Sequence, residues 1–276
     1  MNGNKGKGTY SPIEIAIRAL SIPLILFIWH LLSKALGSYR LPSPLTVFEG
    51  LFTTFFSSNK LNMAGAGSNG FFPHVIATFL KVTVGYTIGA VLGLLFGMLM
   101  KAWKRLNWLT HIPLDILRTV PPIAFVPILF MVLGRSLGIQ VAVIILYSFL
   151  TIVINTMSAI ENVPPIYQRY AMVLGASRLR VYKDVILPHI MPEMLGAFRV
   201  GIIWAWGYQV IIEMMGSDLG LGKVFYHTKL MNALDLVLIG VIWVVLLAGI
   251  TDLFLGMCFK YSNRWQEKIN KEVKKA

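Results

Sequence analysis

The chain has 276 residues, of which 56% are hydrophobic and only 13% are charged, against roughly 25% charged residues in ordinary soluble domains. With a mean hydropathy of +0.70, this composition indicates an integral membrane protein and excludes a soluble globular domain. The formal net charge of +13 does not predict a nucleic-acid interface, because the basic residues lie in loops and tails beside apolar runs. The lone cysteine, Cys258, excludes a disulfide framework and predicts no metal site.

The first elements in chain order are a tail and a spanning helix. Residues 1–12 are rich in Gly and Lys and predict a mobile cytoplasmic tail. The apolar run from Ile13 to Leu36 is long enough to cross a bilayer. It is not followed by a small-residue cleavage site, so we expect a retained helix rather than a signal peptide.

The next segment, Gly37 to Phe72, contains LPSP at 41–44 and "TVFEGLFTTFF", which is typical of a helix lying at the membrane interface. The second predicted span runs from Val82 to Met100. It carries four glycines at a spacing of four, which places them on one helix face and predicts close packing against a neighbouring helix. These packing residues are Gly85, Gly89, Gly93 and Gly97.

The third span, about Leu106 to Leu133, contains four prolines, including Pro121 and Pro122. Each proline removes a backbone hydrogen bond, so we expect this helix to be kinked or locally unwound. Irregular backbone at membrane depth needs protein or water around it, which predicts a place at the centre of the bundle beside any pathway. Asp115 and Arg118 are three residues apart, and two roles stay open for them: an intrahelical ion pair or the lining of a cavity.

The last three spans are Ile139 to Ile160, Pro188 to Met215 and Leu236 to Phe259. The fifth has ionisable or polar side chains at depth, and Glu213 near its end could hold the adjacent "GSDLGLGKVF" in place or sense a solute. The pathway candidates from the third and fifth spans are Asp115, Arg118, Pro121, Pro122, Arg199, Trp204, Gln209 and Glu213.

The distribution of Lys and Arg predicts the orientation. With six spans, most basic residues fall on one side, which we expect to be the cytoplasmic side, together with both termini. Lys81, Arg118 and Arg199 are exceptions that fall within spans. The remaining tail, residues 261–276, is basic and predicted to be cytoplasmic, which leaves residues 13–260 as a single transmembrane domain.

The connector between the fourth and fifth spans, residues 161–188, is charged and predicted to be cytoplasmic. Pro165 suits the first turn of a helix and Gly175 its end. Ser177 can cap a second helix from Arg178 to Leu187, which we expect Pro188 to stop. The first helix has an apolar face that needs a partner, although an ordinary solvated connector remains an alternative. This face comprises Ile166, Tyr167, Tyr170, Ala171 and Leu174.

Signatures of an enzyme are missing from the sequence. The five histidines are scattered, and no paired catalytic carboxylates occur. "GLGKVF" at 220–225 has Val224 where a phosphate loop needs a hydroxyl, so the chain cannot bind ATP by that route. A stand-alone ion-coupled carrier that uses Asp115 and Glu213 stays open as an alternative function.

The connector sequence "RYAMVLGASRLRVYKDVILP", residues 169–188, resembles the cytoplasmic signature of permease subunits of binding-protein-dependent ABC importers. That signature is Glu-Ala-Ala, three residues, Gly, nine residues and Ile-x-Leu-Pro. Ala171, Gly175, Leu187 and Pro188 match it, and Val185 replaces the Ile. Further similarities point to the nitrate/sulfonate/taurine branch: LPSP at 41–44, "LRTVPPIAFVPILFMVLG" at 117–134, "GAFRVGIIWAW" at 196–206 and "EMMGSDLGLG" at 213–222.

The resemblance implies an all-α permease with six transmembrane helices and the type I importer (MetI-like) fold, in the cell membrane. It implies ATP and Mg on a separate ATPase partner, a second permease copy in a homodimer, an external binding protein and a small, anionic solute. The sequence departs from the family at Arg169 and Tyr170, which replace Glu and Ala. The residues implied to contact the ATPase are Ile166, Tyr167, Arg169, Tyr170, Ala171, Leu174, Gly175, Ala176, Ser177 and Arg178.

Overall fold

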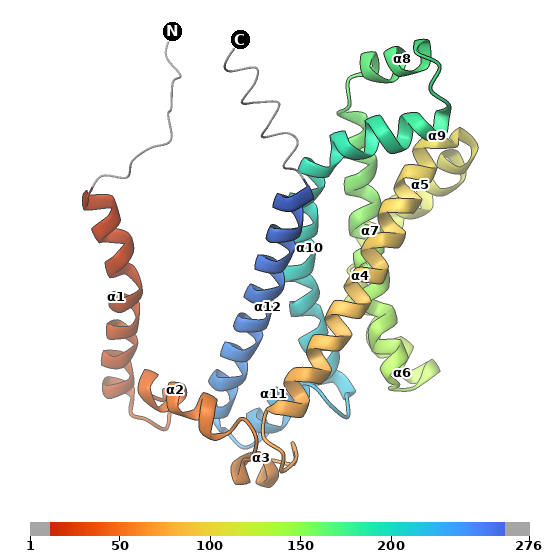
Figure 1. Cartoon of the computed structure of the whole chain (residues 1–276). Coiled ribbons are helices and arrows are strands. Elements are labelled where there is room, and N and C mark those ends of the chain that lie inside the picture. Colours follow the sequence, from red (N-terminus) through yellow and green to blue (C-terminus); the bar gives the residue numbers. More distant parts are fainter. Residues whose placement is uncertain (1–11, 263–276) are drawn as a thin grey trace.

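The computed structural model describes residues 12–262, and the side chains of residues 20–260. This described part of the chain is helical and contains no strand (Figure 1). The predicted tails, residues 1–12 and 261–276, lie almost entirely outside the described residues. Within these limits the all-α fold predicted from the sequence is confirmed.

The predicted spans correspond to six structural units. Four helices are long and apolar enough to cross a membrane: α4 (Phe72–Ala102), α7 (Leu137–Glu161), the continuous helix Arg178–Gly216 and α12 (Leu234–Ser262). A fifth candidate, which we call the broken span, consists of two apolar parts that are bent by 80° relative to each other. These parts are α5 (Lys104–Thr119) and the pair η1 (Pro122–Phe125) and α6 (Val126–Leu133). The sixth unit is α1 (Pro12–Leu36), whose apolar part in the described residues is Leu20–Leu36.

The glycine stripe of α4 lies directly against α7. A Cβ atom built on Gly89 would stand 2.5 Å from the carbonyl oxygen of Ile145. On Gly93 it would stand 2.8 Å from the carbonyl oxygen of Phe149. The backbones of the two helices therefore approach as closely as the predicted small-residue packing requires.

The main apolar core lies where α4, α7 and α10 (Leu187–Gly216) meet, and it includes Val82, Ile144 and Met194. Two hydrogen bonds fix neighbouring helices there. The hydroxyl of Tyr86 donates to the carbonyl oxygen of Phe198 at 2.6 Å, joining α4 to α10. The indole Nε1 of Trp206 donates to Thr251 Oγ1 at 3.0 Å, joining α10 to α12.

Three short helices cap one end of the bundle: α2 (Pro44–Thr53), α3 (Asn59–Met63) and α11 (Leu221–Leu230) (Figure 1). The predicted interfacial helix corresponds to α2. The beginning of α1, the end of α12 and α8 (Pro165–Val173) lie at the opposite end. α1 stands apart from the other long helices in Figure 1.

The connector forms a bend between α8 and α9 (Arg178–Val181), as the sequence predicted. Gly175 has a φ of +84°, and the N–H groups of Gly175 and Ala176 donate to the carbonyl oxygens of Met172 and Ala171, both at 2.9 Å. This is the Schellman arrangement for ending a helix. Ser177 Oγ then accepts the N–H of Arg180 at 3.4 Å and caps α9.

The predicted stop at Pro188 is wrong. Helical structure continues from α9 through a π-helical turn, η2 (Tyr182–Ile186), into α10. The N–H of Leu187 donates to the carbonyl oxygen of Tyr182, five residues earlier. This wider turn places Pro188 in the first turn of α10, where a missing N–H costs little. The result is one continuous helix, from Arg178 to Gly216, that joins the two ends of the bundle.

Candidate functional site

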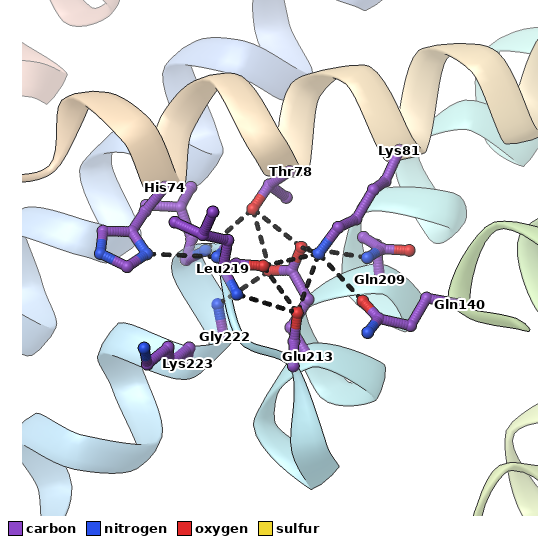
Figure 2. A network of polar contacts seen from close by, with 12 residues as sticks. His74, Thr78, Lys81, Gln140, Gln209, Glu213, Leu219, Gly222 and Lys223 are labelled. Atoms are coloured by element: carbon purple, nitrogen blue, oxygen red, sulfur yellow. Dashed lines mark hydrogen bonds and ion pairs between the residues drawn. The ribbon is translucent and has the colours of Figure 1, made fainter. Parts of the chain in front are cut away.

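A buried polar network surrounds the carboxylate of Glu213 at the α11 end of the bundle (Figure 2). Thr78 Oγ1 donates to it at 2.9 and 3.1 Å, and Lys81 Nζ at 3.0 Å. Gln209 Nε2 and the backbone N–H of Gly222 each donate at 3.0 Å. The carboxylate is therefore held by α4, α10 and α11 at once.

The ammonium group of Lys81 extends the network to a further helix and a loop. It donates to Gln140 Oε1 on α7 at 2.9 Å, to Ser217 Oγ at 2.9 Å and to the carbonyl oxygen of Leu219 at 2.6 Å. The side chains of Lys81 and Glu213 are only 3% and 0% exposed. A buried ion pair of this kind is tolerable only because further hydrogen bonds satisfy both groups.

Side chains of α4 also hold the backbone of the loop before α11. His74 Nδ1 accepts the N–H of Gly220 at 3.2 Å, while its Nε2 lies 3.0 Å from the carbonyl oxygen of Ala66. These contacts fit a neutral imidazole with its proton on Nε2. Thr78 Oγ1 accepts the N–H of Leu221 at 2.8 Å.

The position of Lys81 within a span did not by itself predict a role for it. The signal was the spacing of His74, Thr78 and Lys81, which is four and then three residues and defines one helix face. Of the two roles that the sequence allows for Glu213, the structure fits holding the "GSDLGLGKVF" segment, because the carboxylate accepts the N–H of Gly222. Gln209 lies in the same buried network.

The broken span carries a second group of ionisable side chains. Arg118 Nε and His111 Nδ1 each lie 3.2 Å from a carboxylate oxygen of Asp115. Their side chains are 41–55% exposed. They line a cavity of about 300 Å³ between α5 and α7, so Asp115 and Arg118 form an intrahelical pair and also line a cavity. Pro121 and Pro122 lie at the break itself.

The remaining pathway candidates lie on the exposed side of α10. Arg199 Nε donates to Asp252 Oδ1 on α12 at 2.6 Å, and a second bond joins Arg199 to the other carboxylate oxygen. Trp204 is 59% exposed, with its ring near that of Tyr208. The pairing of Arg199 with Asp252 was not predicted from the sequence.

The connector projects beyond the bundle (Figure 1), and apolar side chains on it are exposed. Val173, Leu174 and Leu179 are each at least 80% exposed, and Tyr170 is 62% exposed. Part of the predicted apolar face packs on its own chain instead, since Ala171 packs against the core and Tyr167 lies beside His189. Ile166 is about half-exposed, and Ala176 is partly buried against the core. The cations around the exposed tip are Arg169, Arg178, Arg180 and Lys183.

The described residues include no group of three or more His, Cys, Asp or Glu residues that could hold a metal ion. They do include helices long and apolar enough to cross a membrane, which defines the chain as a multi-span membrane protein. The chain belongs to the family described as "Binding-protein-dependent transport system inner membrane component", which matches residues 89–268. It is therefore a permease subunit of an ABC importer, and ATP hydrolysis takes place on a separate chain.

Similar proteins come from several solute systems. The nitrate import permease protein NrtB of Synechocystis sp. is 27% identical over 90% of this chain and 88% of its own length. The bicarbonate transport system permease protein CmpB of Synechococcus elongatus is 27% identical over 87% and 85%. The formylaminopyrimidine transport permease protein ThiX of Halalkalibacterium halodurans is 26% identical over 83% and 85%.

A solved structure shares the fold. A chain of the MetNI methionine ABC transporter, crystallised in inward-facing conformations, superposes with a TM-score of 0.60 at 17% identity. The match covers 74% of this chain and 99% of that one. The MetI-like permease fold implied by the sequence resemblance is thereby confirmed.

Proposed function

We propose that two copies of this chain enclose a translocation pathway, and that the broken span α5–α6 faces it. The observation that carries this proposal is the half-exposed cluster of His111, Asp115 and Arg118, which lines a cavity beside Met100 and Glu161 at the ends of α4 and α7. Charged side chains within spanning segments usually face protein or water, because a charge at the centre of a bilayer costs at least about 2.5–3.5 kcal/mol. The irregular backbone between Thr119 and Pro122 adds unsatisfied groups that lipid cannot satisfy. A second copy of the chain and an aqueous pathway would solvate or bind both the charged side chains and these backbone groups.

The solute is a small anion in this proposal. Arg118 places a guanidinium group in the cavity where the pathway would run, and cations along a pathway favour anions. The names of the nitrate and bicarbonate relatives agree with this class. Arg199 supports it less, because it lies outside this cavity and binds Asp252 through two hydrogen bonds, whereas Asp115 lies near only one nitrogen of Arg118.

The connector is the ATPase contact in this proposal, and that ATPase binds the ATP and Mg. A partner is needed because the apolar side chains of α8 and α9 project into water, and an exposed apolar surface surrounded by polar groups is typical of a protein-binding site. In this proposal the chain lies in the inner membrane of the cell, and both of its termini lie in the cytoplasm. An external, solute-loaded binding protein meets the opposite end, where the exposed side chains include Tyr39, Met63, Leu230 and Met231.

Reconstitution tests this function. The chain is placed in liposomes with its ATPase and binding protein, and uptake of labelled nitrate, bicarbonate and a sulfonate is measured. We expect ATP-dependent uptake of one of these anions that requires the binding protein. Uptake by the chain alone, driven by an ion gradient, would overturn the proposal in favour of an ion-coupled carrier that uses Asp115 and Glu213.

A further inference from the structure

The loop 217–222, which connects α10 to α11 and includes the first two residues of α11, is attached to the bundle by buried side chains. Its backbone is held by side chains of α4 and α10, as His74 binds the N–H of Gly220, Thr78 that of Leu221 and Glu213 that of Gly222. Lys81 binds the carbonyl oxygen of Leu219. The position of this loop therefore depends on one set of buried polar side chains.

Two glycines bring the loop into direct contact with the buried carboxylate. A Cβ on Gly220 would stand 2.1 Å from the carboxyl carbon of Glu213, and one on Gly222 2.5 Å from its Cβ. Gly220 also has a φ of +142°, a conformation that other residues rarely adopt. No side chain fits between the loop and Glu213, so a displacement of one displaces the other.

The same loop is open to contact from outside. Asp218 and Leu219 have exposed side chains, while the neighbouring Gly220 and Leu221 are buried. A protein docked at the α11 end of the bundle can therefore press on the loop. A displacement of the loop would then displace the buried network, because the loop backbone is hydrogen-bonded to it.

Glu213 lies near one end of a helix whose other end is the connector. Helical structure is continuous from Arg178 to Gly216, 39 residues, which corresponds to about 58 Å at 1.5 Å per residue. The π-helical turn η2 lies within the connector, and Pro192 lies between this turn and the network. The backbone is helical throughout, so a movement at Glu213 reaches the region next to α8 through one continuous helix.

On the basis of the proposed function, we propose that the Lys81–Glu213 pair and Thr78 lock the loop 217–222 to α4, α7 and α10. Through this lock a solute-loaded binding protein outside stimulates ATP hydrolysis by the partner inside. We call this group of three side chains the outer lock. Its members are positioning residues, because they act through the loop and α10 rather than by touching solute or ATP.

The test uses the complete importer in lipid nanodiscs, with ATPase activity measured with and without solute-loaded binding protein. Thr78→Val removes the hydroxyl that bonds both Glu213 and Leu221 but keeps the shape of the side chain, and Thr78→Ser restores that hydroxyl. Thr228→Val is a matched control. Thr228 is also fully buried, but its hydroxyl donates to Val224 O in its own helix at 2.7 Å.

We expect Thr78→Val to keep basal ATPase activity within about twofold of the wild type. The factor by which the loaded binding protein stimulates that activity should fall at least about fivefold, because fivefold is the lower limit of a typical coupling between two sites. Thr78→Ser and Thr228→Val should keep the stimulation. The double variant Lys81→Met/Glu213→Gln, which removes both charges together, should resemble Thr78→Val. Full stimulation in both Thr78→Val and the double variant would overturn the proposal.

A second measurement separates this proposal from the proposed function. A nitroxide label on Asp218→Cys, in a Cys258→Ser background, reports the mobility of the loop without requiring transport. We expect the label to become more mobile in Thr78→Val than in Thr78→Ser, and equal mobility would overturn the lock. A wild-type complex that the binding protein cannot stimulate would instead count against the proposed function.

Discussion

Replacing Gly89 by alanine tests whether α4 and α7 are held in backbone contact. The new Cβ would stand 2.5 Å from the carbonyl oxygen of Ile145 and 2.7 Å from the Cβ of Ser148. The shorter distance is about 0.9 Å less than ordinary van der Waals contact, so the two helices must separate or bend. Neither atom belongs to a flexible side-chain end that could move aside.

The expected magnitude combines two opposite effects. Overpacking a close contact costs about 1–3 kcal/mol, while alanine is favoured over glycine inside a helix by about 0.8–1.0 kcal/mol. Gly249 on α12 provides the control, because a Cβ there meets nothing within 4 Å. Gly249→Ala should receive only the gain, so the free energies of unfolding of the two variants should differ by about 1–3 kcal/mol.

Both variants are purified in the same mild detergent and unfolded with SDS, and helix content is followed by circular dichroism. We expect Gly249→Ala to be at least as stable as the wild type and Gly89→Ala to be less stable than both. If Gly89→Ala were as stable as Gly249→Ala, the close approach of α4 and α7 would not constrain the fold.

Three further predictions concern the connector and the pathway. Arg169→Glu should weaken copurification of the ATPase roughly tenfold, about 1.4 kcal/mol, because it reverses a charge at the docking surface; unchanged binding would exclude an ion pair there, and Lys223→Glu at the other end serves as control. Gly175→Ala should cost about 1–2 kcal/mol because φ is +84°, and should lower stimulated ATPase activity, whereas Gly196→Ala, which has open space, should not. Arg118→Met should slow anion uptake at unchanged expression, and an unaltered uptake rate would remove Arg118 from the pathway.

The sequence predicted the spans well where it contains a charge-free run of about 20 residues, because such a run indicates a transmembrane helix. It missed the beginning of α4, which starts at Phe72 rather than near Val82. Hydropathy treats Lys81 as a charge facing lipid, but in the fold it faces Glu213. A buried partner from another helix is invisible to a scale that scores residues one at a time.

The same reason explains which ion pairs could be predicted. Asp115 and Arg118 lie one helical turn apart, so their contact follows from helix geometry alone. Arg199 and Asp252 come from α10 and α12, 53 residues apart, and their contact depends on how two helices pack. At Pro188 the sequence rule failed because a local change from α- to π-helical bonding removed the conflict that the rule assumes.

The projecting tip of the connector also bears on how the importer is assembled in the cell. A copy without its ATPase leaves Val173, Leu174 and Leu179 in water, and exposed apolar surface is what chaperones and proteases recognise. We expect subunits without an ATPase to be removed faster than subunits in a complex. The feature proposed to receive the ATPase would thereby also keep the two kinds of subunit in balanced amounts.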